Sequence, residues 1–206
     1  MALMLTLHVV GQNDPGAKTL LDKASKTMSS YENLSLDFEY VLENKAADVE
    51  QSMSGSLVLS GNKYLVNLFG TTQLFDGNKT YTIIPENEEV NISDMDVDDD
   101  NAFTPSKIYS FYKSGYTYTM AEKKNVKGKA VQFVRLTPMD SNSEVDSILV
   151  GIDTKTNHIF QIIEIGKNDT QTTLTAGNLK TNQPLDAGTF SFDEKKYEEM
   201  NYLINK

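Results

Sequence analysis

The stretch LDFEYVLE, residues 36–43, alternates between apolar and acidic side chains along most of its length. Successive side chains of an extended strand point to opposite faces, so this period of two is typical of a half-buried β-strand. The pattern recurs at short intervals between turn signals such as Gly61-Asn62 and Asp76-Gly77. Because the connections are too short for crossover helices, the sequence predicts an antiparallel, meandering sheet of about ten strands that curls or closes. The other expected strands cover residues 56–59, 64–69, 80–84, 89–92, 116–120, 130–137, 147–152, 158–165 and 171–179.

Two helices are expected beside this sheet. Asp14-Pro15 supplies an N-cap and a proline at the first helical position, and apolar residues then recur at helical spacing as far as Tyr31. Thr104-Pro105 is a second pair of this kind, and the short aromatic helix that follows ends at Gly115. This central helix either closes one end of the sheet or acts as a lid or plug over a cavity.

A single domain is expected for a chain of 206 residues in which no repeat or linker is evident. Residues 1–11 are apolar and end in Gly11, like the remnant of a secretory signal peptide, which predicts export. The alternative is a disordered or strand-like terminus, or a true start that lies elsewhere. The domain would then span residues 12–206, and its tail is expected to start as a strand at Phe190 and end in a helical turn capped by Asp193.

Composition excludes several classes of function. The formal net charge of −10 disfavours binding to nucleic acid or to anionic lipid surfaces. The chain has no cysteine and only two histidines, so it can form no thiol nucleophile, iron–sulfur cluster or Cys/His zinc site. His158 could serve as a catalytic base, but its place at a strand entrance favours an exposed hairpin histidine. We therefore expect no enzyme activity and no cofactor.

Five carboxylates lie within residues 94–100, DMDVDDD. Asp94, Asp96 and Asp98 have the spacing of a calcium loop, but Asp99 stands at the position of its glycine and Pro105 at that of its glutamate. We interpret the run as a solvated acidic loop and expect no metal, with a weak calcium site as the alternative.

Several strands carry apolar residues on both faces. In residues 64–69 and 159–165 the apolar side chains exceed what one buried face needs. Such a surplus indicates either an apolar concavity that binds an apolar ligand or an ordinary closed core with helices packed on it. Both interpretations remain open at this point.

The order of short motifs adds information. SYENL (30–34) precedes the LDFEY strand, GSLVL (55–59) and FDGNKTY (75–81) follow, Thr104-Pro105 opens the central helix, and FSF (190–192) lies near the end. This succession resembles the periplasmic outer-membrane lipoprotein carrier (LolA-type) family. The resemblance implies a curved, incomplete antiparallel β-barrel, with an N-terminal helix and a short central helix as lid or plug over an apolar cavity.

The same resemblance implies a function and partners. Carriers of this family take the acyl chains of lipoproteins from an inner-membrane transporter and hand them to an outer-membrane acceptor. We therefore expect a monomeric periplasmic carrier, and a partner-binding or lipid-sensing module of the same fold without transfer activity is the alternative. An enzyme would instead need a buried pair of carboxylates in a cleft.

One departure from the family concerns the lid. Ser60-Gly61-Asn62 replaces a Lys-Arg-Pro turn whose arginine helps to hold the lid closed, so neither that lid control nor the acceptor's identity carries over to this sequence. The residues expected to line the cavity and the lid are Phe38, Tyr40, Leu57, Leu59, Tyr64, Leu65, Val66, Tyr81, Ile83, Ile108, Phe111 and Tyr112.

Overall fold

The computed structural model describes residues 13–94 and 105–206, apart from the side chains of Pro105, Ser106 and Ile108. The signal-like residues 1–11 and the calcium-like spacing at Asp96 and Asp98 therefore lie outside the described part. The elements are α1 (Pro15–Ser29), β1 (Asn33–Asn44), β2 (Val49–Ser60), β3 (Lys63–Leu68), β4 (Thr71–Phe75), β5 (Lys79–Ile84), η1 (Pro85–Asn87), β6 (Glu89–Asp94), α2 (Pro105–Ser110), η2 (Phe111–Lys113), β7 (Tyr116–Val126), β8 (Lys129–Pro138), β9 (Val145–Asp153), β10 (Ile159–Gly166), β11 (Thr170–Thr181), α3 (Glu194–Glu199) and β12 (Leu203–Asn205).

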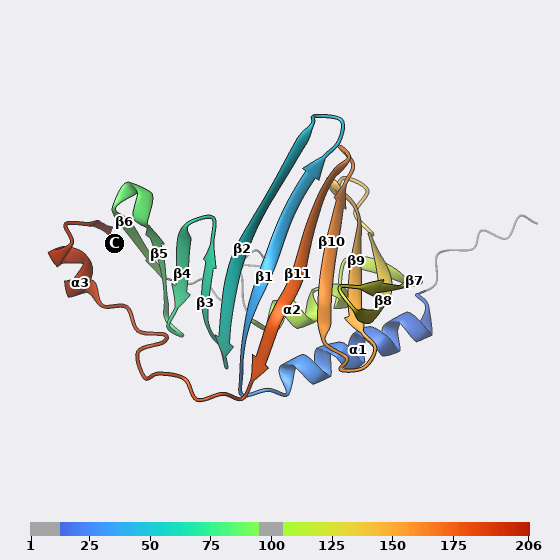
Figure 1. Ribbon diagram of the computed structural model, residues 1–206, viewed down its shortest axis with the longest axis horizontal. Helices are drawn as coiled ribbons and strands as arrows, with labels where there is room; N and C mark the ends of the chain where they lie inside the picture. The colour runs from blue at the N-terminus through green and yellow to red at the C-terminus, as the bar shows by residue number, and fades with distance from the viewer. Residues whose placement is uncertain (1–12, 95–104) are drawn as a thin grey trace, which may run out of the picture.

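The described strands form one open sheet. It holds 12 strands in the order β12-β6-β5-β4-β3-β2-β1-β11-β10-β9-β8-β7 (Figure 1). Every neighbouring pair is antiparallel except β12 with β6, so the predicted incomplete antiparallel barrel is confirmed. The pairing of β1 with β11 joins the two halves of the chain at the centre of the sheet.

Helix α1 begins where the sequence predicts. The Asp14 carboxylate accepts hydrogen bonds from the backbone N–H groups of Gly16 and Ala17, at 2.7 and 3.1 Å. The backbone N–H of Asp14 also donates to the carbonyl of Tyr118 at 3.0 Å, so the start of the helix is tied to strand β7. One stripe of α1 is buried against the sheet, as its apolar spacing requires; its apolar members are Ala17, Leu21, Ala24 and Met28.

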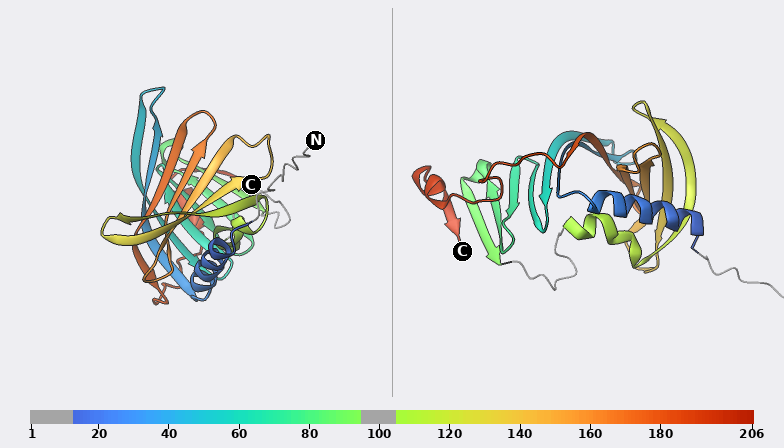
Figure 2. Two further views of the ribbon diagram at one scale, coloured as in Figure 1. Left: turned by 90° about the vertical axis from the view of Figure 1, so that its right-hand side faces the viewer. Right: turned by 90° about the horizontal axis from the view of Figure 1, so that it is seen from below.

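Helices α1 and α2 lie on one side of the sheet, which we call the helix face (Figure 2). Two clusters of buried side chains pack there. The first lies under most of α1 and consists of Ala17, Leu21, Ala24, Tyr112, Tyr118, Val134, Leu136, Ile148, Val150 and Ile152. The second lies between the end of α1, α2 and strands β1 to β4, and consists of Met28, Leu34, Leu59, Tyr64, Phe75 and Tyr109.

The other side of the sheet, which we call the opposite face, is covered by the β7–β8 hairpin and by the C-terminal segment. Val131, Phe133 and Phe160 are buried there, where the twisted β7–β8 hairpin crosses the neighbouring strands (Figure 2). Its tip reaches β1, since Lys127 Nζ lies 2.6 Å from the Glu39 carboxylate. Residues 189–197 lie over this face of β3, β4 and β5, and β12 then pairs with β6.

The tail differs in part from its prediction. The Asp193 carboxylate caps α3 by accepting from the Lys196 N–H at 3.2 Å, which confirms the helical turn. The predicted strand at Phe190–Phe192 is wrong, because this segment turns instead, with hydrogen bonds from Thr189 N–H to Asp186 and from Ser191 N–H to Gly188. Stacking of Phe192 on Tyr81 fixes it to the sheet. Phe192 also stacks on Tyr197, which meets Tyr202 edge to face.

Candidate functional site

The strand register divides the predicted site residues between the two faces. On the helix face, Tyr64 pairs with Leu59 and Val66 with Leu57. On the next strand pair, Leu36 faces Leu57 and Phe38 faces Gly55, so β1 continues the same face. The structure thus brings six of the predicted residues together on the helix face: Phe38, Tyr40, Leu57, Leu59, Tyr64 and Val66.

Leu65, Tyr81 and Ile83 lie on the opposite face. Leu65 and Ile83 line a hollow of about 170 Å³ between the sheet and the C-terminal segment, and Tyr81 stacks on Phe192 with ring centroids 4.5 Å apart. These three residues are therefore separated by the sheet from the six on the helix face. Ile108 belongs to α2, and its side chain lies outside the described part of the structure.

Much of the helix face is filled by the protein's own side chains. Tyr109 of α2 is buried among Met28, Leu34 and Tyr64, and this burial raises the pKa of the Tyr109 phenol. Tyr109 is not among the predicted site residues, although its place in the expected aromatic helix was a usable signal. Any ligand that reached the second cluster would have to displace this ring.

Tyr112 connects the segment after α2 to helix α1. Its ring belongs to the first cluster, and its hydroxyl donates to the Asp22 carboxylate at 2.7 Å. Burial, and then this hydrogen bond, raise the pKa of Tyr112 to about 12. Hydrogen bonds from Lys18 and from Tyr112 lower the pKa of Asp22, so the carboxylate stays charged. Phe111, beside it, is partly buried against the same cluster.

Beyond the two clusters, β1 and β2 extend past the helices (Figure 1). On the helix face there, Phe38, Tyr40, Leu42 and Met53 are apolar and partly buried, and Gln51 and Asn44 are polar. Phe38 can lie flat across β2 because Gly55 has no side chain; a Cβ at that position would come within 2.3 Å of the Phe38 ring. We call the group Phe38, Tyr40, Met53, Leu68 and Phe69 the apolar strip.

Phe69 is the most exposed member of the strip. It is 58% exposed, and its ring meets the edge of the Tyr40 ring at 5.1 Å between centroids. It occupies, with Gly70, the two-residue turn between β3 and β4, and its φ is +54°. Phenylalanine is disfavoured in this left-handed conformation, where asparagine is common. Such strain is characteristic of positions where the side chain has a role of its own.

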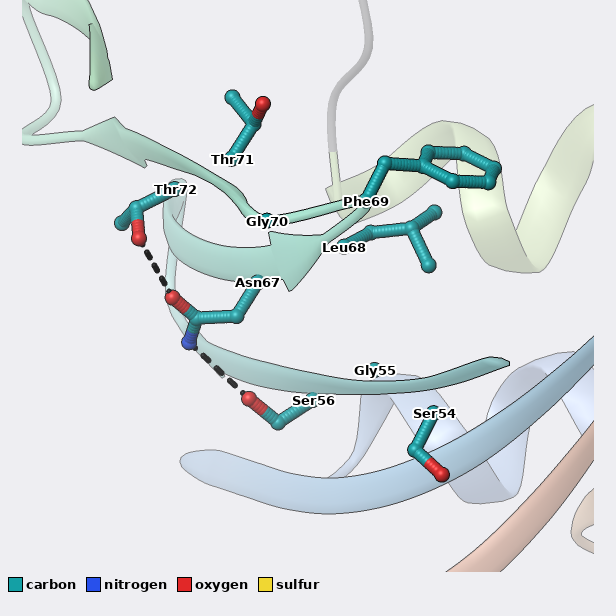
Figure 3. A pocket seen from close by; sticks show the side chains of 9 residues that line it. All are labelled: Ser54, Gly55, Ser56, Asn67, Leu68, Phe69, Gly70, Thr71 and Thr72. Carbon is teal, nitrogen blue, oxygen red and sulfur yellow. Dashed lines mark hydrogen bonds between the residues drawn. The ribbon is translucent and has the colours of Figure 1, made fainter. Parts of the chain in front are cut away.

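A hollow of about 310 Å³ lies beside this turn (Figure 3). Ser54, Gly55 and Ser56 of β2 form one wall, and residues 67–72 form the other. A chain of hydrogen bonds fixes its polar side: Thr72 Oγ1 donates to Asn67 Oδ1 at 2.7 Å, and Asn67 Nδ2 donates to Ser56 Oγ at 3.0 Å. The side chains of Phe69 and Leu68 point away from these polar groups (Figure 3).

His158 is not the exposed hairpin histidine that the sequence suggested. Its Nε2 lies 2.7 Å from the Tyr31 hydroxyl, and the two rings meet edge to face. Burial lowers the pKa of His158. The imidazole therefore helps to join the end of α1 to the β9–β10 hairpin.

Within residues 13–94 and 105–206, no group of three or more His, Asp or Glu side chains is placed to hold a metal ion. Over the same residues, no helix is both long enough and apolar enough to cross a membrane.

The buried carboxylate of Asp153 has a structural role in its own turn. It accepts from the Lys155 N–H at 2.9 Å and lies 3.4 Å from Lys129 Nζ, so it stabilises the β9–β10 turn.

Comparison with known proteins finds similar structures but no similar sequences. No protein-family model and no curated protein matches the sequence. The lipoprotein LppX from Mycobacterium tuberculosis matches with a TM-score of 0.51 and 11% identity, over 84% of this chain and 99% of that chain. LprF from Mycobacterium bovis matches with a TM-score of 0.51 and 14% identity, over 85% and 97% of the two chains. A LolA superfamily protein from Nitrosomonas europaea matches with a TM-score of 0.42 and 9% identity, over 86% and 98%.

This chain shares its open, curved sheet with LppX and LprF at the level of the fold. The incomplete antiparallel sheet that the motif resemblance implied is thereby confirmed. Identities of this size show nothing beyond the fold, so the function of this chain has to be argued from its own side chains.

The sheet carries two functional candidates that the sequence pattern did not indicate. Met53 and Phe69 complete the apolar strip beside the predicted Phe38 and Tyr40. Met53 lies in the polar stretch VEQSMSG, residues 49–55, which gives no signal of a strand. Phe69 was placed at the end of a strand, and its exposure follows from a turn that sequence composition does not predict.

Proposed function

We propose that this protein is a periplasmic carrier that binds the acyl chains of lipoproteins on the helix face of its sheet. The observation that supports it best is the apolar strip. It presents partly exposed aromatic and aliphatic side chains that continue, without a change of face, into the core beneath α2. A surface of this kind suits an elongated apolar ligand, since each buried methylene contributes about 0.8 kcal/mol.

The arrangement of the helices supports entry of such a ligand. The strip holds the first part of an acyl chain, and deeper binding requires Tyr109 to leave the second cluster. The segment with α2 and η2 can move as a unit if the Tyr112–Asp22 hydrogen bond opens, because that bond lies at the partly exposed edge of the cluster. Release at an acceptor then follows when Tyr109 returns and displaces the chain.

A second function is favoured by one observation. Tyr109 fills the space between α2 and the sheet, so the core is closed by the protein itself. A module that binds a partner or senses a lipid, with no transfer, needs no deeper cavity than the strip. The two functions differ in whether a bound lipid is passed on.

The test uses a synthetic triacylated lipopeptide in vesicles. The carrier extracts the lipopeptide into solution and delivers it to a second vesicle population, whereas the module binds it without delivery. Phe69→Asp places a charge on the strip and is expected to weaken binding by about tenfold or more. Met139→Asp is the matched control, because Met139 is also exposed, at 69%, but lies in the β8–β9 connection. Failure of the protein to bind the lipopeptide would overturn the carrier and the lipid-sensing module.

A further inference from the structure

Strand β2 is longer than the strand beside it. It pairs with β1 along its full length, as far as Val49 opposite Asn44. Its pairing with β3 runs only from Ser60 to Ser56, because the chain turns back at Phe69-Gly70. Among the described residues, no strand pairs with the β3 side of residues 49–55, and Figure 1 shows the β1–β2 hairpin extending past β3 and β4. We call this stretch the open edge; it is about 20 Å long.

The open edge presents backbone hydrogen-bonding groups in a regular order. The two-residue turn at Gly61-Asn62 makes Ser60 and Lys63 a hydrogen-bonded pair. Hydrogen-bonded positions alternate along an antiparallel strand, so the N–H and C=O groups of even-numbered residues face β3. On the open edge these residues are Glu50, Ser52 and Ser54, and all three are exposed.

The other edges of the sheet are protected. At one end the edge strand is β12, which has only three residues and pairs with residues 89–91 of β6. Strand β7 pairs with residues at the start of α1, has a bulge between Met120 and Lys123, and carries Lys123 and Lys124. The open edge, VEQSMSG, contains no lysine and no proline. Because natural sheets guard their edges with such devices, an unguarded edge is suited to accept a further strand.

The two faces beside the open edge differ in chemistry. On the helix face lie Val49, which is 37% exposed, Gln51 and Met53, with Phe69 beyond the end of the open edge nearest β3. On the opposite face Glu50 stands directly across from Glu43, a like-charge pair that destabilises the hairpin when isolated. A strand with apolar side chains on the first face and basic side chains on the second would complement both.

We propose that the open edge of β2 binds an extended segment of a partner protein, alternately basic and apolar, which joins the sheet as an added strand. One end of that strand abuts the Phe69-Gly70 turn, where the 310 Å³ hollow receives a side chain. A second copy of this chain is a poor occupant. Its own edge holds no cation to place beside Glu43 and Glu50, and each copy has a net charge of −10.

The first test uses a synthetic peptide of alternating valine and lysine, as long as the open edge, and measures its affinity by calorimetry. In an added strand antiparallel to β2, as β3 is, the lysine N–H groups face β2 and the valine N–H groups face away. N-methylation of the lysine nitrogens is expected to weaken binding by about tenfold or more, and N-methylation of the valine nitrogens by less than about twofold. Equal effects at both positions, or no binding of the parent peptide, would overturn the proposal.

Variants of the protein give a second test. Ser52→Pro removes an N–H that faces the open side and would donate to the peptide, so it is expected to abolish peptide binding. The fold should persist, because proline is tolerated on an edge strand where the N–H faces solvent. Ser52→Val keeps the N–H and is expected to bind normally. Glu50→Gln should weaken binding of the lysine peptide by about fivefold and leave a serine-for-lysine peptide unaffected. If Ser52→Pro does not fold, the N-methylated peptides still test whether the peptide joins the sheet through its lysine N–H groups.

Two further outcomes are informative. Concentration-dependent dimerisation that Ser52→Pro abolishes would assign the edge to a second copy and overturn the proposal. Extraction of the triacylated lipopeptide by Ser52→Pro is expected to equal that of the unmodified protein, because Ser52 points away from the apolar strip. Failure of strand addition can thus be distinguished from failure of the carrier function.

Discussion

Phe69 shows at the scale of one residue how strain and ligand binding are linked. Its left-handed backbone costs about 1–2 kcal/mol, and its ring contact with Tyr40 returns about 0.5–1.5 kcal/mol. For Phe69→Asn these terms nearly cancel, so we expect the free energy of unfolding to change by less than about 1 kcal/mol. Lipopeptide affinity should nevertheless fall, since the strip loses its most exposed ring. Thermal unfolding and lipopeptide titration separate the two effects, and a loss of stability above about 2 kcal/mol would make the ring structural.

His158 provides a second prediction for a single residue. Burial lowers its pKa below the value of 6.5 expected in an unfolded chain, so the unfolded state takes up the proton first as the pH falls. Its contribution to stability is complete above that value and is lost as the pH decreases through the folded pKa. We expect the melting temperature to fall between about pH 7 and pH 5. In His158→Gln this slope should be reduced, and an unchanged slope would assign it to other groups.

At the scale of elements, the segment formed by α2 and η2 is expected to be the part that opens. Tyr112→Phe keeps the ring in the first cluster and removes only the hydrogen bond to Asp22, at a cost of about 1 kcal/mol. Hydrogen exchange should become faster in residues 105–113 and stay unchanged in β9. Asp22→Asn keeps an acceptor oxygen and serves as the milder control. Faster exchange throughout the sheet in Tyr112→Phe would show that this hydrogen bond supports the whole fold.

The sequence predicted those helices and strands whose own residues show a local pattern of alternation or capping. The alternation in β1 and the Asp14 cap of α1 are local patterns, and both agree with the structure. Strand β4, TTQLF, and the start of β2, VEQSMSG, were missed because neither alternates between apolar and polar residues. Their strand conformation comes from pairing with neighbours, which sequence periodicity cannot report.

At the scale of the whole molecule, the candidate site depends on what covers each face. Tyr64, Leu65 and Val66 are consecutive apolar residues, and strand alternation predicts that Leu65 lies on the other face from its two neighbours, but no sequence pattern shows what covers each face. The structure buries Tyr64 beneath α2 and places Leu65 beneath the C-terminal segment, whose residues follow more than a hundred positions later. Both faces of this strand are covered, so an apolar residue alone does not identify the face that binds a ligand.

Leu57 and Leu65 allow this division to be tested with one type of substitution. Both are partly buried leucines on adjacent strands, Leu57 on the helix face and Leu65 on the opposite face. Leu57→Ala and Leu65→Ala should each lower the free energy of unfolding by about 1–3 kcal/mol, because each removes packed methyl groups. Only Leu57→Ala is expected to reduce lipopeptide binding. An equal reduction of lipopeptide binding in both variants would mean that the ligand contacts both sides of the sheet or that binding depends on stability alone. Either result would contradict binding on the helix face.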